Sequence, residues 1–210
     1  MAMQQPAFRP IRLYVANGSL VCRYYEANSA ASAVVWLGGV GGGFDSPAHD
    51  IFDRMAAELI SKQVSSLRIR YRLATDLTSS VEDALVGLEF LESRGVRAAI
   101  TVGYSLGGAV AIQSAAALPL AAGVIGLASQ SYGTSGAELI SPRPLLLVHG
   151  ADDRVMPPEC SRLIFERARE PKKLIVVPGA GHSFDDVESE LHQILADFIS
   201  ENLRLAKTAS

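Results

Sequence analysis

The sequence predicts an α/β fold, in which a mostly parallel central sheet is covered by helices on both faces. Short apolar runs typical of buried strands alternate with longer helical segments along most of the chain. Parallel strands require crossover connections, and such sheets are covered on both faces. The 210 residues, 49% hydrophobic and 20% charged, suffice for one globular domain with a substantial core. We expect that domain to span 1–210, with flexible tails at about 1–10 and 204–210.

The chain opens with two predicted strands, near residues 11–16 and 20–26. Asn17 and Gly18 lie between them, and this dipeptide favours a two-residue hairpin turn. We therefore expect an antiparallel hairpin at the N-terminus. Further strands are predicted near 33–37, 66–70, 98–102, 123–128, 144–149 and 172–177, and helices near 47–62, 80–94, 105–117, 158–169 and 185–203.

One apolar stretch, residues 109–128, is long enough to span a bilayer. It is mostly alanine and contains Gln113, Ser114 and Pro119. A buried helix that breaks at the proline and is followed by a strand explains this composition better than a membrane span.

Residues 103–107 read Gly-Tyr-Ser-Leu-Gly, the G-x-S-x-G pattern of a nucleophile elbow. An apolar run at 98–102 precedes the pattern, and a helix-forming run at 108–112 follows it. A serine on a sharp turn between strand and helix has its hydroxyl exposed above the sheet, beside the free N–H groups of the helix start. We therefore expect Ser105 to be a nucleophile. The alternative is a serine that only caps the helix.

A nucleophilic serine requires a base, and the base requires an orienting acid. Asp152 and Asp153 follow one apolar strand, and His182 follows the next in a glycine-rich loop. Loops at the carboxyl ends of parallel strands lie on one edge of the sheet, so these side chains can meet Ser105 there. Either aspartate could serve as the acid, or both could only cap the next helix. His149, at the end of the first of these strands, is expected to be structural.

The glycine-rich segment 38–43 follows the predicted strand 33–37, where a backbone donor for an oxyanion would lie. We expect the two donors to be the N–H groups of Val40 and Leu106. A dinucleotide-binding loop would require glycine at position 44, where Phe44 stands, and no Gly-Lys-Ser/Thr follows.

In these segments the chain resembles the α/β-hydrolase family, above all its small lidless members that are dienelactone-hydrolase-like or esterase-like. The resemblance extends over about residues 11–202. The family motif H-G-x-x-D-x-x-V-P starts at His149 and ends at Pro157, with Met156 in place of the valine, and this register implies that Asp153 is the acid. The nucleophile is serine, whereas true dienelactone hydrolases use cysteine, so their substrate is not carried over.

Family members with a cap insert it in the segment that corresponds to about 129–143 here. This segment is too short for a helical cap, so we expect no cap domain and a shallow, open site. Substrates would then carry small or exposed acyl groups. Candidate substrate contacts are Gly39, Tyr104, Gln130 and Tyr132.

The sequence therefore predicts a serine hydrolase that acts on carboxylic esters or thioesters through an acyl-enzyme, without cofactor or metal. An acyltransferase with the same triad, or a non-catalytic binding module on this fold, is the alternative. The net charge of −3 and a pI near 5.8 argue against nucleic acid as a partner. Cys22 and Cys160 are interpreted as free thiols, and no signal peptide is evident, so we expect a cytoplasmic protein with a small-molecule substrate and no membrane partner.

Overall fold

Eight strands form a single sheet in the computed structural model, which describes residues 7–15 and 18–208. Their order across the sheet is β1-β2-β4-β3-β5-β6-β7-β8. The antiparallel strands β1 and β2 form the N-terminal hairpin, and β3 to β8 run parallel to one another. The strands are β1 (Arg9–Val15), β2 (Gly18–Tyr25), β3 (Ser32–Leu37), β4 (Ser65–Arg70), β5 (Ala98–Tyr104), β6 (Ala121–Leu127), β7 (Leu145–Gly150) and β8 (Lys172–Val177).

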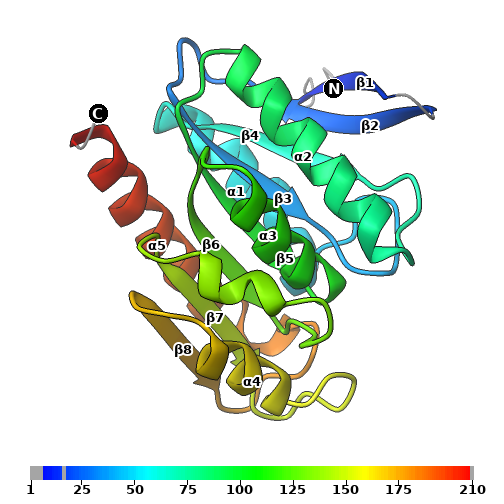
Figure 1. The fold of residues 1–210 in the computed structure, drawn as a ribbon, viewed down its shortest axis with the longest axis vertical. Coiled ribbons are helices and arrows are strands. Elements are labelled where there is room, and N and C mark those ends of the chain that lie inside the picture. Colours follow the sequence, from blue (N-terminus) through cyan, green and yellow to red (C-terminus); the bar gives the residue numbers. More distant parts are fainter. Residues whose placement is uncertain (1–6, 16–17, 209–210) are drawn as a thin grey trace, which may run out of the picture.

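Helices cover both faces of this sheet (Figure 1). α1 and α5 pack on one face, and α2, α3 and α4 pack on the other. The expected mostly parallel sheet with helices on both faces and an antiparallel N-terminal hairpin is confirmed. The helices are α1 (Pro47–Ser61), α2 (Leu77–Ser93), α3 (Leu106–Ala117), α4 (Glu159–Arg167) and α5 (Glu188–Thr208), with the 3₁₀ turns η1 (Ser135–Leu139) and η2 (Asp185–Val187).

The central strands are buried on both sides, which explains their continuous apolar sequence. In β3, Val35 and Leu37 belong to the core under α2 and α3, whereas Val34 and Trp36 belong to the core under α1 and α5. The shortest register between neighbouring described strands joins β6 to β7, where four residues of each strand pair.

Secondary structure extends close to both ends of the described chain: β1 begins at Arg9, and α5 continues to Thr208. The single domain over 1–210 with flexible tails at about 1–10 and 204–210 stays a prediction. Asn17, the first residue of the predicted hairpin turn, lies outside the described residues, while Gly18 pairs with Val15 at a φ of +129°.

The starts of α1, α2 and α5 differ most from the sequence prediction, and α5 begins at Glu188, three residues later than expected, after the turn η2. α2 begins three residues earlier than expected, because the Asp76 carboxylate accepts a hydrogen bond of 2.8 Å from the Ser79 N–H and caps the helix there. In α1, residues 48–50 adopt left-handed φ values between 47° and 63°, so the regular helix starts only after them. This turn is held by a 2.7 Å hydrogen bond from the Ala48 N–H to the Ser183 carbonyl.

The apolar stretch 109–128 is divided as expected. α3 ends at Ala117, and β6 begins at Ala121. None of the described helices combines the length and apolarity needed to cross a bilayer.

Candidate active site

Ser105 lies on a strained turn between β5 and α3. Its φ of 57° and ψ of −115° are rare for a residue with a side chain. The Ser105 N–H donates to the Leu127 carbonyl at 2.9 Å, and the Ser105 carbonyl accepts from the Gly108 N–H at 3.1 Å. Neighbouring backbone thus holds the serine in this conformation, which is the geometry that the G-x-S-x-G pattern predicts.

The glycines of the pattern are required by close backbone contacts. A Cβ atom at position 103 would lie 1.9 Å from the Gly107 carbonyl oxygen, and one at position 107 would lie 2.3 Å from the Leu37 carbonyl oxygen. Neither contact is possible, so only glycine fits at either position. The start of α3 can therefore approach both β5 and the end of β3.

Asp153 and His182 form a hydrogen bond at the same edge of the sheet. His182 Nδ1 lies 2.7 Å from Asp153 Oδ2, although Asp153 follows β7 and His182 follows β8. A carboxylate only accepts, so Nδ1 carries the proton, and Nε2 of the neutral ring retains its lone pair. That tautomer is the one a general base needs.

Asp153 is buried and ionised. Its Oδ1 accepts from the Val155 and Met156 N–H groups at 2.9 and 2.8 Å. Burial acts to raise the pKa of Asp153, but the hydrogen bonds from these N–H groups and from His182 outweigh it, so the pKa is lowered. Asp152, the other candidate acid, is exposed. The structure thus pairs His182 with Asp153.

His182 lies beside the elbow. Its ring contacts the ring of Tyr104, the residue before Ser105, with 5.1 Å between centroids. Ser105 is 8% exposed and the His182 side chain 15%, so solvent reaches both. Among the described residues, the Ser105 hydroxyl has no hydrogen-bond partner. Hydrogen bonds between a nucleophilic serine and its base are often long or poorly aligned before substrate binds.

The glycine-rich segment after β3 lies against Ser105. A Cβ atom on Gly39 would be 3.3 Å from the Ser105 Cβ atom. The next residue, Val40, is exposed, and Leu106 occupies the first turn of α3, where N–H groups lack partners within the helix. Leu106 thus directly follows the serine, and Val40 follows the glycine that contacts it. The role of their N–H groups as oxyanion donors remains a prediction.

Asp45 is a residue of the site that sequence reasoning did not assign to it. Its Oδ2 atom lies 2.9 Å from the position that a Cβ atom would take on Gly39, and 3.1 Å from the corresponding position on Gly41. The Arg68 guanidinium donates to the backbone carbonyls of Phe44 and Asp45 and so fixes the end of this loop. An acid two residues after a glycine-rich segment was the available sequence signal.

The other predicted substrate contacts lie on the loop after β6. The Gln130 N–H lies 3.4 Å from the Ser105 carbonyl, while its side-chain amide donates to the Tyr132 carbonyl at 3.1 Å. The Tyr132 side chain is 78% exposed. Contact of Gln130 and Tyr132 with substrate stays a prediction.

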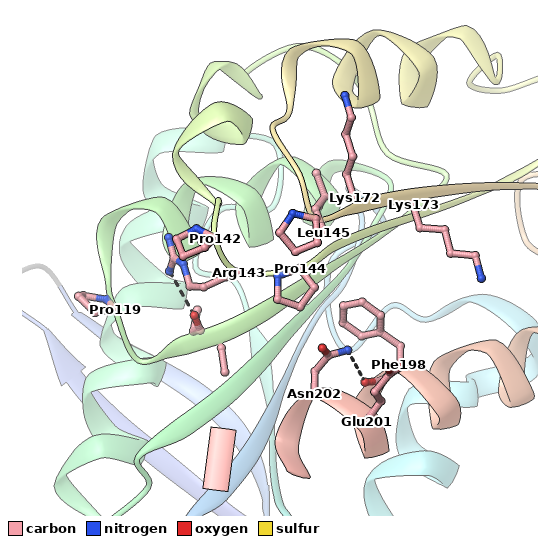
Figure 2. A pocket seen from close by; sticks show the side chains of 13 residues that line it. Pro119, Pro142, Arg143, Pro144, Leu145, Lys172, Lys173, Phe198, Glu201 and Asn202 are labelled. Carbon is pink, nitrogen blue, oxygen red and sulfur yellow. Dashed lines mark hydrogen bonds between the residues drawn. The ribbon is translucent and has the colours of Figure 1, made fainter. Parts of the chain in front are cut away.

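A separate groove lies at the opposite edge of the sheet, where β6, β7 and β8 begin (Figure 2). Two of its cations are bound to backbone carbonyls: Arg143 donates to Ala115 and Ala121, and Lys172 donates to Phe165 and Ala168. This groove is lined by prolines and contains no arrangement of nucleophile, base and acid among the residues that the structure describes, so the edge with Ser105 is the candidate active site.

Comparisons with known proteins agree with this architecture. The family model described as the dienelactone hydrolase family matches residues 30–209. A dienelactone hydrolase from Anabaena variabilis superposes with a TM-score of 0.79 at 18% identity, over 95% of this chain and 99% of that one. An alpha-beta serine hydrolase homologue from Coxiella burnetii gives a TM-score of 0.74 at 19% identity, over 89% and 95%.

A curated relative covers less of the chain. The uncharacterized protein YfhR of Escherichia coli K12 is 38% identical over 77 residues, which are 35% of this chain and 27% of YfhR. The matched segment thus spans about a quarter of that relative's length. The solved structures confirm the α/β-hydrolase fold.

Proposed function

Because the chain belongs to the dienelactone hydrolase family, we propose that it is a serine hydrolase that cleaves carboxylic esters or thioesters. The observation that carries this proposal is the 2.7 Å hydrogen bond between His182 and Asp153, beside a serine on a strained elbow. A base, its orienting acid and a serine hydroxyl within reach of solvent at one sheet edge match the requirements of acyl transfer.

In the first step, Ser105 Oγ attacks the carbonyl carbon of the substrate, and its proton passes to His182 Nε2. The carbonyl electrons move to the oxygen, which accepts hydrogen bonds from the Val40 and Leu106 N–H groups. Collapse of this intermediate breaks the bond to the leaving oxygen or sulfur. That atom takes the proton from His182, and the acyl group remains on Ser105.

In the second step, a water molecule attacks the acyl-enzyme while His182 accepts its proton. The intermediate collapses, the acid product leaves, and Ser105 recovers its proton from the imidazolium. Asp153 holds the ring in position throughout and stabilises its positive charge. Each proton taken up by His182 is thus returned within the same step.

The open surroundings of the elbow favour small acyl groups or acyl groups that project from a larger molecule. Between β6 and β7 the chain forms only the short turn η1, and Val40 and Tyr132 are 57% and 78% exposed. A long apolar chain would find little surface to cover it.

The test is a fluorophosphonate probe, which reacts only with activated serines, followed by intact mass measurement. We expect one adduct on the wild type and on the control variant Ser183→Ala, and none on Ser105→Ala. A wild type that is folded but takes no adduct would refute the activated serine. A series of aryl esters and thioesters of increasing acyl length would then define the substrate class.

A further inference from the structure

His149 lies at the end of β7, four residues before Asp153, and is completely buried. Its Nε2 atom is 2.9 Å from the Met156 carbonyl oxygen and 3.2 Å from Asp153 Oδ2. On the other side of the ring, Nδ1 is 2.6 Å from the Ser161 hydroxyl. Both ring nitrogens therefore have polar partners in the interior.

These partners determine which nitrogen carries the proton. A carbonyl oxygen and a carboxylate oxygen only accept hydrogen bonds, so Nε2 must carry a hydrogen. Burial lowers the pKa of His149, partly offset by the Met156 carbonyl and Asp153, which keeps the ring neutral near pH 7. Nδ1 of the neutral ring then accepts a hydrogen bond from the Ser161 hydroxyl.

Asp153 Oδ2 is thus shared by two imidazoles. It accepts from His182 Nδ1 at 2.7 Å and faces His149 Nε2 at 3.2 Å, while Oδ1 is held by two backbone N–H groups. With donors on both oxygens, the carboxylate keeps its orientation when the His182 ring moves.

We propose that His149 is a positioning residue for the acid. Its Nε2 atom keeps Asp153 Oδ2 in place and sets how strongly that oxygen binds His182. This inference rests on the proposed function, in which His182 is the base. The Nε2–H of His149 donates to the Met156 carbonyl and lies 3.2 Å from the same carboxylate oxygen. Its partial positive charge withdraws electron density from the carboxylate, so the carboxylate stabilises a protonated His182 less. His149 thereby keeps His182 available as a base at lower pH.

A purely structural role would need only the bond to Met156, which closes the acid loop. The contact with Oδ2 is what distinguishes the two roles, because it couples His149 to the titration of His182. Tyr104 contacts the His182 ring, Asp45 and Asp185 act on Tyr104 together with Asp153, and Asp152 and Arg154 adjoin Asp153 in the chain. The variants described below leave all of these groups in place.

The experiment compares His149→Phe, which removes the donor, with His149→Gln, which restores an N–H at the same reach. Ile164→Val, in the buried face of α4, controls for a loss of stability without change at the site. Two pH dependences are measured: kcat/KM for a fluorogenic acetyl ester, and the ring NMR signals of His182. The chain has only four histidines, so these signals can be assigned by substitution.

We expect His149→Phe to move the acidic limb of kcat/KM, and the midpoint of the His182 ring signals, up by about half a pH unit, the size of one modest hydrogen bond. The plateau of kcat/KM should fall about tenfold, as for other outer partners of reactive groups. His149→Gln and Ile164→Val should keep both midpoints of the wild type. Unchanged midpoints in His149→Phe, with a lower melting temperature, would overturn the proposal.

Ser161→Ala provides a test that leaves both histidines in place. Without the hydrogen bond from the hydroxyl to Nδ1, the Nε2–H of His149 is a weaker donor towards Asp153, so a smaller upward shift is expected. Absence of any shift would count against the proposal even if His149→Phe fails to fold. A wild type inert towards esters and probe would refute the proposed function, while the NMR midpoints would still decide the role of His149.

Discussion

The rings of Tyr104 and His182 lie against each other, with centroids 5.1 Å apart and planes inclined by 43°. Tyr104 precedes the serine on the elbow, so the segment that presents the nucleophile also supports the base. Asp153 fixes the other side of the imidazole through Nδ1. The ring is thus held both along its hydrogen bond and across its face.

Replacing Tyr104 by leucine should therefore lower kcat/KM for an aryl ester by about 10- to 100-fold, because the imidazole loses its lateral support and small displacements are costly. Tyr104→Phe keeps the ring and should stay within about twofold of the wild type. Burial, together with Asp45, Asp153 and Asp185, raises the pKa of Tyr104 to about 12. Tyr104→Phe should accordingly leave the pH profile unchanged up to about pH 10.

Gly107→Ala should destabilise the protein by about 3 kcal/mol or more and abolish probe labelling, since its Cβ atom would lie 2.3 Å from the Leu37 carbonyl oxygen. The matched control is Gly181→Ala, where a Cβ atom has nothing within 4 Å and φ is not left-handed. Thermal unfolding of both variants measures the difference. Equal melting temperatures would show that α3 can move away from β3.

Asp53→Asn should cost about 3 kcal/mol of stability. Arg68 is almost completely buried and forms an ion pair of 2.6 Å with Asp53, so removal of the carboxylate leaves an uncompensated interior charge. Glu26→Gln breaks ion pairs with the exposed Arg9 and Arg94 instead, and should cost less than about 1 kcal/mol. Urea unfolding of both variants provides the comparison.

Asp53→Asn should also reduce kcat/KM, because Asp53 holds Arg68 in place. Arg68 also holds the carbonyls of Phe44 and Asp45 at the end of the glycine-rich loop. A decrease in stability without any change in kcat/KM at a temperature where the variant is folded would contradict this link.

The lowered pKa of Asp153 predicts how stability depends on pH. A carboxyl with a lower pKa in the folded state contributes stability above its unfolded value, here 3.8, and loses it as pH falls through the folded value. Below about pH 4, the wild type should therefore lose stability faster than Asp153→Asn. Urea unfolding between about pH 2.5 and 6 tests this, and parallel curves for the two proteins would contradict it.

Much of the architecture followed from sequence because local signals and tertiary packing agree. The alternation of apolar strands with helices predicts the sheet, and the break at Pro119 correctly separates α3 from β6. The left-handed turn at residues 48–50 was not predictable. No glycine marks it, and a contact with Ser183, 135 residues away in sequence, holds it in place.

At the site, the order and spacing of the residues sufficed to predict that Asp153 and His182 lie close together, because each follows its own parallel strand. The second contact of Asp153 was missed. A histidine at the end of a buried strand is most often a packing residue, and only the folded structure shows that its Nε2 atom lies 3.2 Å from the carboxylate oxygen. The position of Asp45 depends likewise on how its loop folds back over Gly39.

β6 and β7 pair through only four residues of each strand, and this affects how the protein loses activity when it unfolds. Ser105 follows β5, whereas Asp153 and His182 follow β7 and β8 on the far side of that four-residue junction. Local opening there would detach the outer pair of strands and carry the acid and base away from the nucleophile, while the remaining sheet persists. Catalysis would thus report on partial unfolding of this edge, and should fail at lower urea concentrations than the circular dichroism of the whole fold.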